Sequence, residues 1–269
     1  MNDRRMVLVA LLTVLYAACG GDSDASHSQS ATLAAVQREL AATFAGIDAA
    51  LHTATAALAT TGVDTAAARP VLRATCAQRP YAIDCATIDS AGILRIIEPA
   101  EYRPYEGTDV SGQPAVQQLL RTGQSVFSDA FAGFEGIASV AFASPVFVGG
   151  SGLAGAASLQ VSPSELCDAI IAPAVAGTQL DSWVMQRDGL IVYETDPTQI
   201  GLNLFTDPLY QPYPELIALG ERIAAEPRGV GYYSFLIHGT DTVVKKKAVW
   251  DTVALYDNEW RVVIYRVVP

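Results

Sequence analysis

The chain has 269 residues, of which 51% are hydrophobic, and it carries a formal net charge of −11 at pH 7. That length and composition suit one or two compact domains with apolar cores. The acidic excess repels phosphate backbones, so nucleic acid is not expected as a partner.

Residues 1–18 have the layout of a secretory signal peptide. Arg4 and Arg5 precede an apolar run, and small residues follow it up to Cys19. The apolar stretch of about a dozen residues is shorter than the roughly 20 that a membrane-spanning helix needs. We therefore expect the chain to be exported and the segment to be removed.

Cys19 ends the sequence Leu-Tyr-Ala-Ala-Cys over residues 15–19, which resembles the bacterial lipobox. Tyr16 departs from that pattern, which prefers Leu, Val or Ile at this position. The resemblance implies lipidation at Cys19 and an anchor on the periplasmic or extracellular side of the membrane. Residues 19–30 then form a flexible polar tether. The alternative is an ordinary signal peptide that is cleaved nearby.

Residues 31–62 are predicted to form a long stalk helix. Its large apolar side chains recur at threes, fours and sevens: Leu33, Leu40, Phe44, Ile47, Leu51 and Leu58. The period of about 3.5 permits coiled-coil pairing and thus a homodimer through this helix. The Ala-rich composition is equally typical of a helix that packs on its own domains.

Three cysteines follow Cys19 in the sequence. Cys76 and Cys85 lie close together in a polar segment, and export makes their oxidation plausible, so we predict a disulfide between them. Cys167 is predicted to be a small buried core residue. There is no further cysteine pair and the three histidines are far apart, so no metal site is expected.

From residue 86 onward the pattern alternates as in strands, and an internal repeat appears. Each copy has a hairpin with an Asp/Gly turn, a helical stretch and three further strands. The predicted strands after the helices are 125–131, 137–148 and 153–161 in the first copy, and 229–237, 243–255 and 259–267 in the second. The fold class is therefore α+β: a long N-terminal helix followed by two modules, each with an antiparallel sheet of about five strands and flanking helices.

This order of elements resembles the double Cache (dCache) domain, the extracytoplasmic sensor unit of many bacterial receptors, whose modules are PAS-like. The resemblance is carried by residues 98–113, 126–129, 183–189 and 200–208. It implies a membrane-distal module at 63–163, a linker helix within 164–178 and a membrane-proximal module at 179–269. It also implies a small-molecule ligand in the first module and no cofactor.

Family members are commonly followed by a membrane span and a cytoplasmic signalling module. Here the last predicted strand is followed directly by Pro269. We therefore expect a free-standing lipoprotein form, which would need a membrane receptor partner to signal.

The resemblance also bears on the ligand. Amino-acid-binding members bind the carboxylate of the ligand with an Arg-x-Trp-Tyr-like cluster and its amine with an Asp on the last strand. Here residues 111–116 read Ser-Gly-Gln-Pro-Ala-Val, and Gln160 is aligned with that Asp. Both sets of binding residues are missing, so we expect a small organic ligand other than an α-amino acid.

The candidate ligand site in the first module combines aromatic and polar side chains, as small-molecule pockets do. Its members are Tyr102, Tyr105, Asp109, Ser128 and Asp129. The alternative is a structural role, in which Asp109 caps the next helix while Ser128 and Asp129 hold a turn.

Two further motifs have structural interpretations. Residues 150–155 match the G-x-G-x-x-G fingerprint, but a strand follows where a dinucleotide site needs a helix, so we predict a turn. The lysines at 245–247 indicate either an edge strand protected by charge or an anion contact.

No catalytic motif stands out, and His238 lies in a predicted turn, so the chain is not expected to be an enzyme. The sequence thus predicts a lipid-anchored small-molecule-binding protein. The alternatives are a structural or protein-interaction lipoprotein with no ligand and, third, an exported hydrolase.

Overall fold

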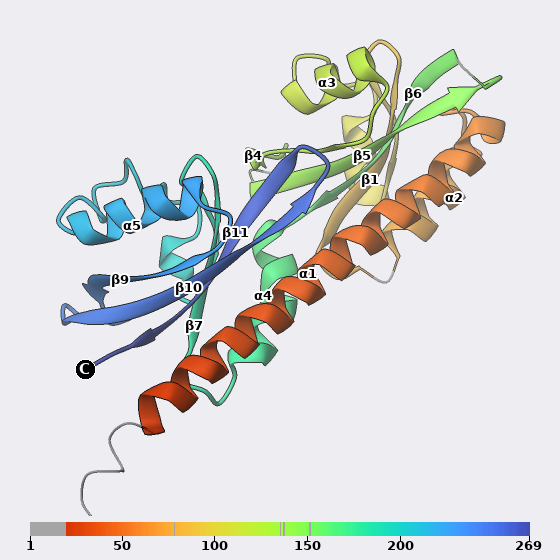
Figure 1. Cartoon of the computed structure of the whole chain (residues 1–269). Coiled ribbons are helices and arrows are strands. Elements are labelled where there is room, and N and C mark those ends of the chain that lie inside the picture. The colour runs from red at the N-terminus through yellow and green to blue at the C-terminus, as the bar shows by residue number, and fades with distance from the viewer. Residues whose placement is uncertain (1–19, 78, 135, 137, 151) are drawn as a thin grey trace, which may run out of the picture.

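The computed structural model describes residues 20–269 except 78, 135, 137 and 151. Two modules lie along one long helix, α1 (Gly20–Thr61), as Figure 1 shows. The predicted signal peptide and Cys19 lie outside the described residues. Among the helices in the described part of the chain, none combines the length and apolar character needed to cross a bilayer.

The first module contains a six-stranded antiparallel sheet with the path β2-β1-β6-β5-β3, and β4 pairs with β5 off this path. Its elements are α2 (Ala68–Cys76), β1 (Ala82–Asp89), β2 (Leu94–Glu98), the 3-10 helix η1 (Ala100–Tyr105), α3 (Pro114–Thr122), β3 (Val126–Phe127), β4 (Phe131–Ala132), β5 (Ala138–Val148) and β6 (Gly152–Val161).

The second module contains a five-stranded antiparallel sheet in the order β8-β7-β11-β10-β9. Its elements are the linker helix α4 (Pro163–Val175), β7 (Asp181–Gln186), β8 (Ile191–Glu194), the 3-10 helix η2 (Pro197–Gln199), α5 (Pro214–Ala225), β9 (Gly229–Leu236), β10 (Val243–Leu255) and β11 (Asn258–Val267). The predicted α+β class, with a long helix and two antiparallel modules, is confirmed.

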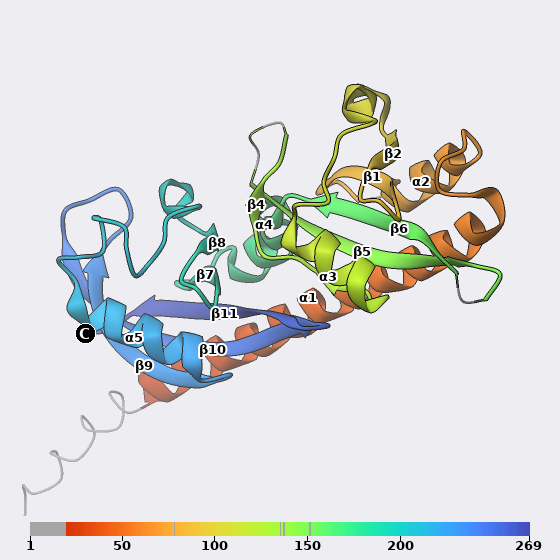
Figure 2. The same ribbon diagram turned by 90° about the horizontal axis from the view of Figure 1, so that it is seen from above.

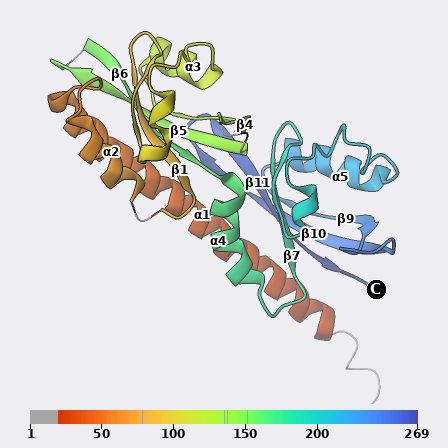
Figure 3. The same cartoon turned by 180° about the vertical axis from the view of Figure 1, so that it is seen from behind.

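The long helix lies on one face of both sheets, while α3 and α5 lie on the opposite face (Figure 1). Seen from behind, α4 crosses from the first module to the second and packs on α1 (Figure 3). Each sheet is therefore a layer between α1 on one side and its own short helix on the other.

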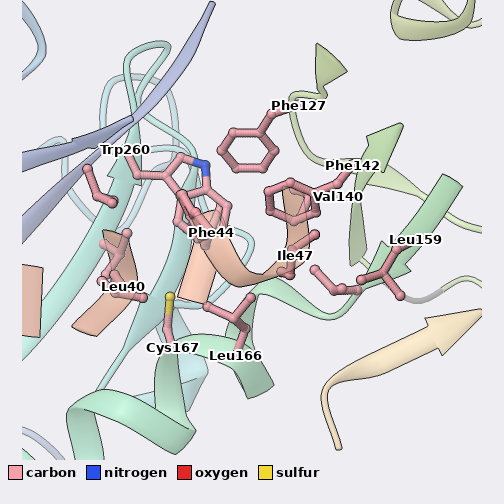
Figure 4. Packing of buried hydrophobic residues seen from close by; sticks show 14 of the residues in the cluster. Leu40, Phe44, Ile47, Phe127, Val140, Phe142, Leu159, Leu166, Cys167 and Trp260 are labelled. Atoms are coloured by element: carbon pink, nitrogen blue, oxygen red, sulfur yellow. The ribbon is translucent and has the colours of Figure 1, made fainter. Parts of the chain in front are cut away.

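The apolar stripe of α1 is buried in the core that it shares with both modules. Phe44 is 1% exposed, and its ring centroid lies 5.1 Å from that of Phe127 and 5.3 Å from that of Trp260. Figure 4 shows the rings of Phe127, from the first module, and Trp260, from the second module, beside Phe44 of α1. Because this stripe contacts the chain's own sheets, it cannot serve the predicted coiled-coil homodimer.

The start of α1 differs from the predicted flexible tether at residues 19–30. The helix begins at Gly20, and the Gln29 Nε2 amide donates hydrogen bonds to the main-chain oxygens of Lys247 at 2.8 Å and Ile264 at 2.9 Å. Lys247 Nζ also lies 2.8 Å from Ser26 Oγ. The tether prediction is wrong over the described part of this segment, because the second sheet holds it in place.

The cysteines adopt the predicted arrangement. A disulfide joins Cys76, at the end of α2, to Cys85 on β1, with their Cα atoms 5.9 Å apart. Cys167 is buried in α4, and this burial raises the pKa of its thiol far above the ordinary value. A thiol in that setting is an apolar core residue rather than a nucleophile.

Within the glycine-rich segment 150–155, Gly150 lies in the turn after β5, and the part from Gly152 onward belongs to β6 and not to a helix. A side chain at Gly155 would clash with the Ile88 main-chain oxygen, so glycine is required where β6 approaches β1. The edge-strand interpretation of residues 245–247 is wrong, because β10 lies between β11 and β9 in the sheet.

Candidate functional site

A cavity of about 470 Å³ lies in the first module, on the face of the sheet turned away from α1. Alternation along β5 separates the two faces: Val140 and Phe142 belong to the core shared with α1, whereas Ala141 and Ala143 line the cavity. Helices η1 and α3 cover the same face. The cavity therefore lies between the sheet and its short helices.

The floor of the cavity is made of small side chains. Ala86, Ala141, Ala143, Ala156 and Ser158 all line it. Its walls include aromatic side chains from η1 and from the segment that follows β3: Tyr102, Tyr105, Phe131 and Phe134. Small floor residues leave the space, and aromatic walls supply apolar surface for a ligand.

Among the described residues that line the cavity, the polar side chains are acidic or neutral. Three of them carry carboxyl groups: Asp84, Asp129 and Asp257. The amides are those of Gln113, Gln118, Gln160 and Asn258.

The second module contributes directly to the cavity. Asp257 and Asn258 lie at the turn between β10 and β11, whose tip points toward α3 in Figure 2. Gln118 Nε2 on α3 donates a hydrogen bond to Asp257 Oδ2 at 3.1 Å. One wall of the first-module cavity is thus built by the other module.

Four of the five predicted site residues line the cavity: Tyr102, Tyr105, Ser128 and Asp129. Asp109 does not. It is exposed, and its Oδ1 accepts a hydrogen bond from the Ser111 main-chain N–H at 2.9 Å. Hydrogen bonds from Ser111 lower the pKa of Asp109. The prediction that placed Asp109 in the pocket is wrong, because its carboxylate holds the loop before α3.

Ser128 has a structural role at the cavity wall. Its hydroxyl accepts from the Ala141 main-chain N–H at 2.8 Å and donates to the Asp129 main-chain oxygen at 2.7 Å. The first contact ties the end of β3 to β5, and the second fixes the main chain at Asp129. Ser128 therefore shapes the wall, and its hydroxyl is already engaged within the protein.

Asp129 is held from the second module. Gln186 Nε2 on β7 donates to Asp129 Oδ1 at 2.9 Å, and Gln186 Oε1 accepts from the Ala130 main-chain N–H at 3.1 Å. Gln186 is buried, so this amide is a fixed clamp on the segment after β3. The cavity is coupled to the second module here as well as at Asp257.

The residues that the sequence prediction missed are mainly Asp84 and the tip of the second-module hairpin. Asp84 alternates with Ala86 and Ile88 along β1, and all three line the cavity. That spacing was a usable signal. Asp257 and Asn258 gave none, because only the packing of the two modules brings them to the site.

The interior of the second module is filled at the corresponding place, where the space is about 20 Å³. The strand registers of the two modules match row by row. Ala86 and Ala143 share one partner on β6, just as Trp183 and Trp250 share one on β11. The next row reads Asp84, Gln160 and Ala141 in the first module and Asp181, Tyr265 and Ala248 in the second.

By the same matching, Lys246 is equivalent to Ser139 of the first module. Each lies two residues before its matched alanine, Ala248 or Ala141. Lys246 is 4% exposed, and its Nζ donates to the Leu236 main-chain oxygen at 2.8 Å. That nitrogen lies 4.5 Å from the centroid of the Tyr265 ring and 5.4 Å from that of Phe235. The second module thus holds an ammonium group of its own among aromatic rings.

Glu194 lies in the same interior, and the Tyr265 hydroxyl donates to its Oε1 at 3.2 Å. Burial raises the pKa of Glu194 to about 8, although hydrogen bonds and the nearby Lys246 oppose the shift. Burial likewise lowers the pKa of Lys246 below its ordinary value. Within the residues that the structure describes, no group of three His, Cys, Asp or Glu side chains is placed to hold a metal ion.

Comparison with known proteins agrees with this architecture. Residues 42–163, which include most of the first module, match the family described as HK/GC/Chemotaxis protein-like, sensor domain. No curated protein matches the sequence.

Solved structures extend the likeness to both modules. An extracellular ligand binding receptor from Desulfohalobium retbaense superposes with a TM-score of 0.73 at 26% identity over 87% of this chain; the chain spans 39% of that receptor. A methyl-accepting chemotaxis protein X gives 0.68 at 12% identity, covering 92% of this chain and 99% of that one.

The ligand-binding domain of the Pseudomonas aeruginosa amino acid chemoreceptor PctB, in complex with L-Arg, gives a TM-score of 0.60 at 17% identity, with 91% and 94% coverage. The predicted resemblance to extracytoplasmic sensor domains is confirmed. The matched family consists of sensor domains rather than enzymes, in agreement with the prediction that the chain is not an enzyme.

Proposed function

We propose that this double Cache sensor domain captures a small organic molecule in the cavity of its first module. The observation that carries the proposal is the contrast between about 470 Å³ of space in the first module and about 20 Å³ in the second. Small-molecule sites are clefts of roughly 300–1,000 Å³ with apolar walls and a few placed polar groups. The first-module cavity fits that description in both size and lining.

The proposal also covers how ligand binding in the cavity is communicated to a partner protein. Gln186 and Asp257 of the second module contact the cavity segment and its helix α3. A ligand that moves Asp129 or α3 would therefore change contacts between the modules. A membrane receptor partner that binds the chain across both modules could detect this change.

We test ligand capture with a thermal-shift panel of organic acids, amines, purines and sugars, run on the parent and on Ala141→Phe. A ligand at a hundredfold over its dissociation constant adds about 2.7 kcal/mol of stability to the parent. The phenyl ring in the variant occupies the cavity, so its shift should vanish. If no compound shifts the parent, or if the variant shifts equally, the protein-interaction alternative is favoured.

We also propose that the exported chain is anchored through lipidated Cys19. Support comes from the lipobox-like residues 15–19 and from the neighbours, which are extracellular domains. In detergent phase separation the parent should enter the detergent phase, while Cys19→Ser should stay in the aqueous phase. Each buried methylene of an acyl chain contributes about 0.8 kcal/mol to membrane binding. Equal partitioning of both proteins would contradict the anchor.

A further inference from the structure

The side chains around the first-module cavity carry charge of one sign. Asp84, Asp129 and Asp257 are acidic, and no Lys, Arg or His is among the described residues that line the cavity. The other polar groups there are amides and hydroxyls. A charged group that leaves water for an apolar cavity needs a partner of opposite sign, so this lining favours a cation over an anion.

The aromatic walls point the same way. The rings of Tyr105 and Phe134 are stacked, with their centroids 5.0 Å apart, and both line the cavity with Tyr102. The face of an aromatic ring attracts an organic cation, most strongly when the cation has left water. Acidic side chains and aromatic rings together make a surface suited to an ammonium group on an apolar body.

The second module provides an internal parallel. Its Asp181 matches Asp84 by strand register, and Tyr265 matches Gln160. There the ammonium of Lys246 lies over the Tyr265 ring at 4.5 Å. At the position of Lys246 the first module has Ser139, which accepts a hydrogen bond from Gln160 at 3.0 Å. The second module thus supplies a positive charge from its own chain, whereas no described lining residue of the first-module cavity supplies one.

We propose that the ligand of the first-module cavity is a small organic cation: an amine with an apolar or aromatic body and no carboxylate. This inference rests on the proposed function, because it names the chemical class of ligand for the same site. Among the described lining residues, a ligand carboxylate would meet three acidic side chains and no basic one. An amine would meet the acidic side chains and the ring faces.

The test uses three probes that share a phenylalkyl body and differ in charge: 2-phenylethylamine, 3-phenylpropanamide and 3-phenylpropionate. Titration calorimetry on the full chain at low salt should show binding of the amine. The amide should bind at least about tenfold more weakly, and the propionate should not bind measurably. Added salt should weaken binding of the amine, because salt screens the attraction between opposite charges.

Isosteric variants locate the charge. Asp84→Asn and Asp129→Asn should each lower the affinity for 2-phenylethylamine by about 10- to 150-fold, which is the effect of losing one charged hydrogen bond. The side-chain amide introduced by Asp129→Asn can still accept from Gln186 through its Oδ1, so the clamp is retained. Asp188→Asn, an exposed change of the same charge in the second module, is the matched control and should leave binding unchanged. Unfolding curves establish that each variant is folded.

The outcomes separate the inference from the function on which it rests. Binding of 3-phenylpropionate or 3-phenylpropanamide as tightly as the amine overturns the inference and leaves capture in the cavity intact. So does a thermal-shift panel that yields only neutral or anionic ligands. If both acidic variants bind the amine as the parent does, the inference is also overturned. A panel silent for every compound class contradicts the proposed function itself.

Discussion

The two modules share strand order and register but differ in what fills the space between sheet and short helix. At matched positions the first module has Ala86 and Ala143 where the second has Trp183 and Trp250. The first keeps about 470 Å³ of space and the second about 20 Å³. The difference in cavity volume between these two modules therefore follows from side-chain size at a few sheet positions and not from topology.

The comparison also shows two ways to treat charge in the same location. The second module buries Lys246 and Glu194 together and closes the interior around them. In the first module Asp84, Asp129 and Asp257 line an open space. The second interior is filled by the chain's own side chains, and the first is the one for which we propose a ligand.

The largest effect is expected when a large side chain is removed from the filled interior of the second module. Trp250 is 1% exposed, and its Nε1 donates to the Glu226 main-chain oxygen at 3.0 Å. Trp250→Ala should lower the free energy of unfolding by about 3–5 kcal/mol, because it leaves a cavity that the neighbours cannot close. Urea unfolding measures the loss. A loss below about 1 kcal/mol would mean that the second interior is not tightly packed.

Filling matched positions is the converse experiment. Ala248 is fully buried in the second module, so Ala248→Phe should overpack that interior and cost about 3 kcal/mol or more. Ala141→Phe, at the matched position, places its ring in the open cavity and should cost about 1 kcal/mol or less. The midpoints of urea unfolding compare the two variants. Equal destabilisation would contradict the difference in space between the modules.

The buried charge of the second module predicts a dependence on pH. Burial raises the pKa of Glu194 from 4.5 to about 8, so between these values the folded chain holds a proton that the unfolded chain has released. The free energy of unfolding should therefore fall as pH rises through this window, by up to roughly 1.4 kcal/mol per pH unit. Glu194→Gln should remove this slope, as unfolding curves at pH 5, 6, 7 and 8 will test.

The first module should not share this slope. Burial alone would raise the pKa of Glu98, but hydrogen bonds from Arg73 and Arg103 outweigh it and lower the pKa below 4.5. The contribution of Glu98 is thus present at neutral pH and is lost only as pH falls into the acid range. A slope between pH 5 and 8 that survives in Glu194→Gln would show that another group is responsible.

The smallest expected effect concerns the link between the modules. Gln186→Ala removes the two hydrogen bonds to the segment 129–130 and should cost about 1–3 kcal/mol. Ser234→Ala, which removes an exposed hydrogen bond to Glu215, should change stability by at most about 0.5 kcal/mol. Chemical unfolding of both variants makes the comparison. Equal effects would mean that Gln186 is not a clamp.

Periodicity and turn chemistry predicted most of the fold from the sequence. The hairpin turns and most of the strands after each helix lie within a few residues of their expected places, because alternation and Asp/Gly turns are local signals. The predicted strand 125–131 is instead two short strands, β3 and β4, which pair separately with β5. The position of β10 inside its sheet was not local information. It depends on β9 and β11 pairing on both sides, and so the lysines at 245–247 were misread.

The candidate site was predicted in part for the same reason. Tyr102, Tyr105 and Asp129 lie in one stretch of the chain where polar and aromatic residues gather, and the structure brings them to the cavity. Asp109 has the same composition around it but turns its carboxylate to Ser111. Asp257 reaches the cavity only because the second module docks on α3. Local composition contains neither fact.

The central claim is that the ligand enters the first module and not the second, and methyl NMR tests it most directly. With ¹³C-labelled alanine methyl groups, titration with 2-phenylethylamine should shift the signals of Ala86, Ala141, Ala143 and Ala156. The signal of Ala248, at the position matched to Ala141, should not move. A shift of Ala248 with the ligand, while the four first-module alanines stayed fixed, would contradict ligand capture in the first module.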